Sequence, residues 1–219
     1  ALAWAAGGRN ESAVERARHA LDLAPTNTAV QLLLAPVLKG EQADASVALF
    51  EEVLQREPDN REALLGLARR YLDQRDADRA EILLDRAQAA GLEPRSIAVE
   101  RALVLVGRGR RDEARALLLE TVRQDKERAG VWMALALMAM EDGDASLAAT
   151  AVEELKRAST YAPGQLFLAD YSLQKADPAG ARTHLERAAA HDRGNPAIWE
   201  RWATLDYVEG RLPDAARRA

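Results

Sequence analysis

Small and apolar residues recur along this chain with a period of 33 or 34 residues, which is the main pattern in the sequence. The anchor positions of the repeat hold alanine or serine: Ala13, Ser46, Ala80, Ala114, Ala148, Ala181 and Ala215. Further apolar or small residues stand four and seven positions after most anchors, a spacing that places them on one face of a helix. A second column lies twelve positions before the anchors and reads Ala1, Leu34, Ala68, Ala102, Ala136, Ala169 and Ala203. The pattern therefore predicts two helices in each unit, with small residues where their backbones cross.

Glycine and proline positions agree with this division into helices. Glycine is typical of a helix end in the left-handed conformation, and the column five positions before the anchors reads Gly8, Glu41, Arg75, Gly109, Gly143, Ala176 and Gly210. Asp177-Pro178 and Asn195-Pro196 have the form of an N-cap residue followed by proline at the first helical position. Pro36 is the exception, because it lies inside a predicted first helix, and we expect it to kink that helix.

The repeat resembles the tetratricopeptide repeat, whose unit is a 34-residue helix–turn–helix. The fullest matches are Leu64, Leu67, Ala68 and Tyr71 with Ala80, Leu84 and Ala87, and Trp132, Leu135 and Ala136 with Gly143, Ala148, Val152 and Leu155. The resemblance covers the whole chain and implies an all-α fold, a right-handed superhelical α-solenoid of antiparallel helix pairs, as one domain over residues 1–219. The approximate units are 1–26, 27–60, 61–94, 95–128, 129–161, 162–195 and 196–219.

The chain starts within a predicted first helix and stops within a predicted second helix. Natural helical arrays end in polar capping repeats, and neither end has that character. We therefore expect a fragment of a longer array, whose ends, including the Trp199–Trp202 face, stack against another copy in end-to-end self-association.

Composition and charge exclude several functions. The 219 residues include 35 Asp or Glu, 30 Lys or Arg and no cysteine, for a net charge of −5. The absence of cysteine excludes a disulfide framework and a thiolate nucleophile, and the acidic balance disfavours nucleic-acid binding. The longest uncharged apolar run, residues 129–140, is too short to span a bilayer. We expect a soluble protein without membrane insertion, in the cytoplasm or the periplasm.

Candidate chemistry is sparse, and we expect a protein that is not an enzyme and needs no metal or cofactor. His184 and His191 are seven residues apart and, with Asp192, suggest a metal site only superficially, so we interpret them as solvated histidines. The densest basic cluster consists of Arg108, Arg110, Arg111 and Arg115. Acidic residues interrupt it, which favours a solvated turn over an anion-binding patch.

The resemblance implies that the first helix of each unit lines a concave binding face. The residues that it places there are Glu62, Leu65, Gly66, Arg69, Asp73, Glu100, Leu103, Met133, Leu137, Glu141, Phe167, Asp170, Glu200 and Arg201. Because six acids stand against two arginines, the face indicates a protein or peptide partner with apolar anchors and basic flanks. Glycine in mid-helix is costly, so Gly66 suggests a place where a ligand approaches closely. The methionines Met133, Met138 and Met140 fit either the core or this groove.

The main interpretation is therefore a non-enzymatic scaffold that binds a partner segment in its concave groove. One alternative is the repeat part of a bacterial exopolysaccharide export machine, in which the acidic groove would contact a cationic polysaccharide or its modifying enzyme. Another is a scaffold of RNA processing, because Trp199, Trp202 and Ala203 of the last unit resemble half-a-tetratricopeptide repeats. The related pentatricopeptide repeats, which read RNA, have a longer period and fit the acidic charge poorly.

Overall fold

The computed structural model of the chain describes residues 15, 18–38, 40–158 and 162–211. These residues form helices and turns, with no β-strand among them. They belong to two compact units, one ending at Gln124 and the other beginning at Asp125. Ala13, Ala215 and most of the predicted unit 1–26 lie outside the described residues.

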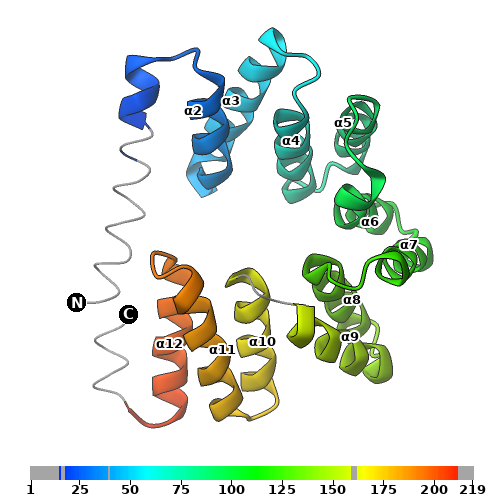
Figure 1. Cartoon of the computed structure of the whole chain (residues 1–219), viewed down its shortest axis with the longest axis vertical. Helices are drawn as coiled ribbons and strands as arrows, with labels where there is room; N and C mark the ends of the chain where they lie inside the picture. The colour runs from blue at the N-terminus through cyan, green and yellow to red at the C-terminus, as the bar shows by residue number, and fades with distance from the viewer. Residues whose placement is uncertain (1–14, 16–17, 39, 159–161, 212–219) are drawn as a thin grey trace. The chain divides into compact units, whose positions relative to one another are not determined.

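Three helix pairs make up the first compact unit after a helical segment at residues 18–23 (Figure 1). The α-helices are α2 (Thr28–Leu34), α3 (Ala43–Arg56), α4 (Arg61–Asp73), α5 (Ala77–Ala89), α6 (Ala98–Gly107) and α7 (Arg111–Gln124). Short 3₁₀ segments, η1 (Ala35–Val37), η2 (Gly40–Gln42) and η3 (Pro94–Ile97), lie between them. The two columns of small residues meet in each pair, since Ala68 of α4 and Ala80 of α5 are both fully buried.

The second compact unit repeats the same arrangement. It contains α8 (Ala129–Glu141), α9 (Ala145–Ala158), α10 (Ala162–Gln174), α11 (Pro178–His191) and α12 (Pro196–Val208). Ala169 and Ala181 are fully buried where α10 packs against α11. The all-α fold of packed helix pairs is therefore confirmed.

Trp202 packs into the core that α10, α11 and α12 share. It is 7% exposed, contacts the cluster of Leu166 and Leu185, and lies beneath the guanidinium of Arg182 at 5.3 Å. Trp199 is half-buried, and its indole Nε1 donates to the backbone oxygen of Arg193. The expectation of an open Trp199–Trp202 face is thus wrong for Trp202, while self-association itself stays a prediction.

Polar caps begin several helices where the sequence predicts them. Asp177 Oδ1 accepts from the Gly180 amide and Asn195 Oδ1 accepts from the Ala197 amide, and proline follows each cap. Pro36 is expected to kink its helix, but the α-helix does not continue past it: α2 ends at Leu34 and is followed by the 3₁₀ turn η1. Proline lacks the amide hydrogen that a longer α-helix would need.

The turns within the pairs adopt the left-handed conformation that the glycine column predicts. Gly109, Gly143 and Gly210 have φ of 74°, 72° and 74°. Arg75 and Ala176 adopt φ of 61° and 57° at the corresponding positions without being glycine. A β-carbon in this conformation crowds the backbone and costs roughly 1–2 kcal/mol, so two turns of the chain are strained.

Replacing Ala176 with glycine is expected to raise the free energy of unfolding by about 1 kcal/mol, because it removes the left-handed strain. Chemical denaturation measures the change. Ala149 is exposed in the middle of α9, and Ala149→Gly should instead lower stability by about 1 kcal/mol. Destabilisation by both substitutions would contradict the strain at Ala176.

Candidate functional site: the first-helix face

The predicted binding residues lie on the first helices of the pairs, which are neighbours within each compact unit. Helix α4 packs beside α6 in one unit, and α10 packs beside both α8 and α12 in the other (Figure 1). We call the surface formed by the fourteen predicted residues the first-helix face and consider it separately in the two units. Eight of its side chains are exposed: Glu62, Arg69, Asp73, Leu103, Leu137, Glu141, Asp170 and Glu200.

Two ion pairs join neighbouring first helices on this face. Arg69 of α4 reaches Glu100 of α6, with Nη2 2.7 Å from Oε1. Arg201 of α12 reaches Asp170 of α10, with Nε 2.8 Å from one carboxylate oxygen and 2.9 Å from the other. The pairs occupy the same two repeat positions, each 31 residues apart, with the charges exchanged. Both basic residues of the predicted face are therefore engaged within the chain.

Glu100 is the one predicted acid that the structure buries. Its exposed fraction is 7%, and its carboxylate is held by Arg69. The expectation that Glu100 faces a partner is therefore wrong, because its charge stabilises the contact between α4 and α6. A buried carboxylate that loses its partner pays a desolvation penalty, so a charge reversal at Glu100 would test folding more than binding.

The remaining charge of the face is acidic. Asp73 pairs with Arg70 one turn earlier on α4, with Nη1 3.3 Å from Oδ2. Glu62 at the start of α4 and Glu200 in α12 are exposed and have no ion-pair partner among the described residues. Once the paired charges cancel, these carboxylates leave each unit with an acidic first-helix face.

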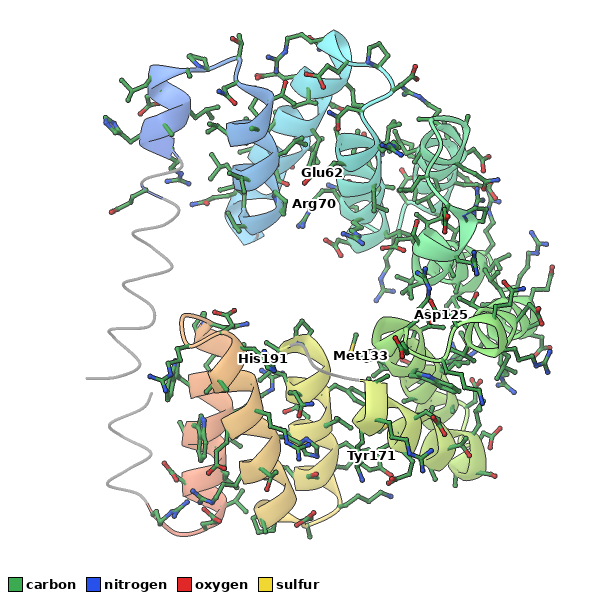
Figure 2. The ribbon with its side chains drawn as sticks, viewed as in Figure 1. Glu62, Arg70, Asp125, Met133, Tyr171 and His191 are labelled. Atoms are coloured by element: carbon green, nitrogen blue, oxygen red, sulfur yellow. The ribbon has the colours of Figure 1, made fainter. Side chains whose placement is uncertain are left out.

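Apolar side chains of the face stay partly accessible. Leu103 is 49% exposed and Leu137 is 45% exposed, while Met133 and Phe167 are half-buried (Met133 is labelled in Figure 2). Leu137 and Phe167 occupy on α8 and α10 the repeat positions that carry the ion pairs elsewhere. A single exposed leucine is ordinary. Here, however, the same repeat positions are charged on some first helices and apolar on α8 and α10, so the first-helix face is more apolar at these two helices.

The methionines divide between core and surface. Met138 is 8% exposed in α8, whereas Met133 and Met140 are half-buried. The α8 sequence is apolar on all sides, which is typical of a helix with contacts all round. Met138 therefore belongs to the core, and a role of Met133 in the groove stays a prediction.

Gly66 serves packing between repeats. A β-carbon at this position would lie within 3.0 Å of three carbons of the Phe50 ring. Phe50 belongs to α3 of the preceding pair and is 1% exposed. The expectation that Gly66 makes room for a ligand is wrong, since the space is filled by Phe50.

His184 is buried rather than solvated, which corrects the sequence interpretation. It is 6% exposed, and its Nδ1 lies 2.8 Å from Oε1 of Gln165 on α10. Gln165 stands where the other units have Leu64 or Trp132, so a hydrogen-bonded polar pair replaces an apolar contact. Burial lowers the pKa of His184, and the nearby charges of Arg187 and Lys156 lower it further.

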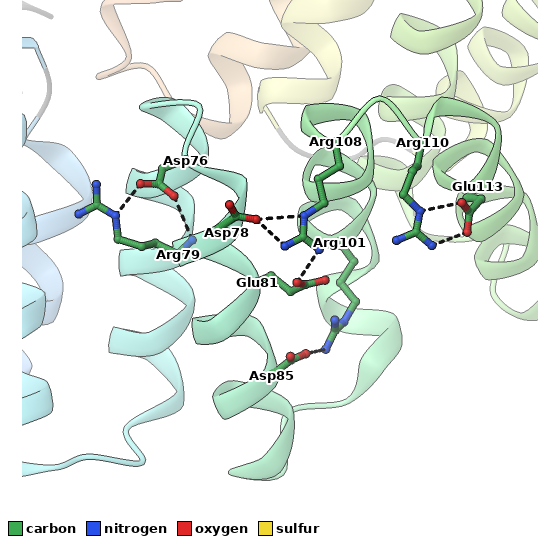
Figure 3. A network of polar contacts seen from close by, with 9 residues as sticks. All are labelled: Asp76, Asp78, Arg79, Glu81, Asp85, Arg101, Arg108, Arg110 and Glu113. Carbon is green, nitrogen blue, oxygen red and sulfur yellow. Dashed lines mark hydrogen bonds and ion pairs between the residues drawn. The ribbon is translucent and has the colours of Figure 1, made fainter.

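The basic cluster in the turn after α6 is neutralised by acids of the same chain (Figure 3). Arg108 contacts Asp78 and Glu81 of α5, both at 2.6 Å, and Arg110 contacts Glu113 at 2.6 Å. These hydrogen bonds raise the pKa of both guanidinium groups above the ordinary range. The arrangement supports a turn held by ion pairs and not a patch reserved for anions.

Sequence reasoning missed three clefts that recur at equivalent places in the repeat. Each lies between the turn of one helix pair and the end of the next first helix, and we call them the turn-edge clefts. Their volumes are about 380 Å³ beside Gly40 and Gln74, about 620 Å³ beside Arg75 and Val106, and about 430 Å³ beside Gly143 and Lys175. Their lining residues occupy equivalent repeat positions near the last turn of each first helix. Aligning those positions across the units would have grouped these residues from the sequence alone.

Other kinds of site have no support in the described part of the chain. No group of three or more His, Cys, Asp or Glu residues there has a geometry suited to a metal ion. None of the helices described is both long and apolar enough to cross a bilayer.

Paired helices stacked side by side, with accessible first helices, define a helical-repeat protein. Two tetratricopeptide repeat models match residues 37–103 and 99–163, together more than half of the chain. The chain therefore belongs to the tetratricopeptide repeat family.

Several solved structures of low sequence identity share its fold. A tetratricopeptide repeat protein from Parabacteroides merdae has 14% identity and a TM-score of 0.68, covering 97% of this chain and 80% of that one. A thermophilic tetratricopeptide repeat protein from Thermus thermophilus, TTC0263, has 20% identity and a TM-score of 0.62, covering 82% and 98%. Yeast Tom70 has 15% identity and a TM-score of 0.69, with 94% of this chain covering 44% of Tom70. No curated protein sequence matches this chain significantly.

Proposed function

We propose that this protein is a non-enzymatic scaffold whose first-helix face binds a partner segment with apolar anchors and basic flanks. Membership of the tetratricopeptide repeat family supports an interaction scaffold in general. The observation that carries the finer proposal is the surface left after internal pairing. Leu103, Leu137 and Phe167 remain accessible, and the carboxylates of Glu62 and Glu200 have no ion-pair partner within the described part of the chain.

The chemistry of such a surface favours a basic amphipathic segment. Burial of leucine and phenylalanine side chains contributes roughly 25 cal/mol per Å² of apolar area before the entropy cost of association is subtracted. Exposed carboxylates add modest attraction for Lys or Arg and mainly select the sign of the partner's charge. Arg69 and Arg201 do not oppose this preference, because Glu100 and Asp170 already neutralise them.

Charge reversal on the face is the first test. Peptides selected from a random display library against the full chain should be enriched in Lys and Arg beside apolar residues. Glu62→Lys or Glu200→Lys should then weaken the selected peptide by about fivefold in calorimetry. Glu186→Lys is the matched control, since Glu186 is exposed on the second helix α11 and has no ion-pair partner among the described residues. Absence of basic peptides among those selected, or equal effects of all three reversals, would overturn the proposal.

The same chain distinguishes the alternative ligands. A cationic glucosamine oligomer and a single-stranded RNA can be titrated in parallel, with the fluorescence of Trp132 and Trp199 as readout. Binding of the oligomer without peptide selection would favour the polysaccharide alternative, and salt-dependent RNA binding would favour the RNA-processing one.

A further inference from the structure

The turn-edge cleft between α8 and α10 combines an apolar lining with a single positive charge. Ala139, Met140, Ala145 and Ala148 line one side, and Tyr171, Gln174 and Lys175 line the other (Tyr171 is labelled in Figure 2). The lining contains no carboxylate. Lys175 lies over the ring of Tyr171, with Nζ 5.6 Å from the ring centre, and has no acidic partner among the described residues.

The corresponding cleft between α4 and α6 has the same character. Leu72, Leu103 and Val106 provide its apolar lining, and Arg75 stands at its edge in the strained left-handed conformation. The cleft contains one carboxylate, Asp73, which Arg70 already engages. Arg75 itself has no ion-pair partner in the described part of the chain.

Arg75 differs from the arginines on the segments around it. Arg79, Arg101, Arg108 and Arg110, on neighbouring segments, all hold carboxylates of the same chain (Figure 3). Arg75 has no ion-pair partner among the residues that the structure describes, and it stands at a position where three other turns have glycine. Backbone strain retained at a surface cleft is a recognised mark of a functional position.

We propose that these two turn-edge clefts bind a partner peptide in which an apolar side chain stands beside an Asp or Glu. The apolar side chain enters the cleft, and the carboxylate meets Lys175 in one unit or Arg75 in the other. Volumes of about 430 and 620 Å³ are within the range of small-ligand sites, which are mostly apolar with a few polar groups that fix orientation. This partner chemistry is opposite in charge to that of the first-helix face. The cleft between α8 and α10 shares no residue with that face, whereas the cleft between α4 and α6 shares Asp73 and Leu103 with it, so segments of the two kinds would compete there.

A pair of short peptides tests the proposal on the full chain. The probe is acetyl-Ala-Leu-Glu-Leu-Ala-amide, and its control replaces the glutamate with glutamine. In a two-dimensional amide NMR titration at millimolar concentration, the probe should shift the signals of Gly143 and Lys175 and those of Arg75 and Gly107. The glutamine peptide should bind about fivefold more weakly, because it lacks the charge.

Substitutions separate the contribution of the cation from non-specific binding of the peptide. Lys175→Glu should weaken probe binding at its own cleft by about fivefold or more and leave the Arg75 cleft unchanged. Lys126→Glu is the matched control, since the Lys126 side chain is exposed, lines none of these clefts and has no ion-pair partner among the described residues. Arg75→Gly should abolish the preference for the acidic peptide at the second cleft while keeping the fold, because glycine suits its backbone conformation.

Three results would overturn the proposal: absence of shifts at millimolar probe, equal binding of the glutamate and glutamine peptides, or equal effects of Lys175→Glu and Lys126→Glu. None of these depends on the outcome at Glu62 and Glu200, so the turn-edge clefts and the first-helix face are tested separately.

Discussion

Replacing Gly66 with alanine is expected to lower the free energy of unfolding by about 2 kcal/mol. The new methyl group would collide with the Phe50 ring, which is 1% exposed and packed in the core around α3 and α4. Overpacking of this kind typically costs about 1–3 kcal/mol. Helix propensity alone predicts the opposite sign, a gain of about 1 kcal/mol from glycine to alanine. The sign of the change therefore shows which effect dominates at this crossing.

Repeating the substitution in a Phe50→Leu variant tests whether the collision with the Phe50 ring causes the loss of stability. In Phe50→Leu the smaller side chain leaves room, so the added Gly66→Ala should be close to neutral. Urea denaturation of the four variants gives the coupling energy, which we expect to be about 1–3 kcal/mol for residues in direct contact. An equal loss in both backgrounds would show that Gly66 is needed for a reason other than Phe50.

Replacing His184 with leucine is expected to destabilise the protein by about 2 kcal/mol. The substitution removes the hydrogen bond between the buried side chains of His184 and Gln165, and breaking a buried hydrogen bond by removing one partner costs roughly 1–3 kcal/mol. Adding Gln165→Leu restores the apolar contact of the other units, so the double variant should recover most of the loss. If the double variant is no more stable than the single one, the hydrogen bond is not what holds α10 to α11 here.

The same pair predicts a pH dependence of stability. Burial lowers the pKa of His184 below 6.5, with Arg187 and Lys156 acting in the same direction and Asp177 against them. The unfolded chain therefore binds a proton at a higher pH than the folded chain does, and stability falls as the pH drops through about 6.5. Carboxylates with a lowered pKa, such as Glu57 and Asp76, also stabilise the folded protein, and this contribution is lost only at more acidic pH.

Denaturation midpoints measured between about pH 8 and about pH 5 isolate the histidine. The wild-type midpoint should decrease over this window, and the Gln165→Leu/His184→Leu variant should show a much flatter profile. His191→Gln is the control, because it removes an exposed imidazole at the end of α11 and leaves the buried pair of His184 and Gln165 in place. A slope that persists in the double variant would assign the pH dependence to other groups.

The helix pairs could be predicted because their signals are local. The anchor alanines, the caps Asp177 and Asn195 and the turn glycines each act within a few residues of their own position. Pro36 illustrates the limit of this reasoning, since its effect was foreseen while the length of the helix that it ends was not. Local rules locate helix ends, and packing decides how far each helix extends.

The candidate site was predicted less completely because its chemistry depends on partners far along the chain. The repeat register placed the first-helix residues, but it did not show that Glu100 lies within reach of Arg69, 31 residues earlier. Likewise, the neighbours of Gly66 and His184 are Phe50 and Gln165, which belong to other helices. A count of charged residues treats all charges alike. The structure distinguishes charges held in ion pairs within the chain from charges that stay available to a partner.

The exchanged charges of the two inter-helix ion pairs also constrain how this gene segment can be rearranged. Recombination between similar repeats tends to delete, duplicate or reorder whole units. If the units holding Glu100 and Arg201 traded places, Arg69 would face an arginine and Asp170 would face a glutamate at positions where the chain now has attraction. Like charges at such contacts repel. The inter-helix ion pairs therefore favour the present order of the units. An array with the same helices in another order would have weaker contacts between neighbouring first helices.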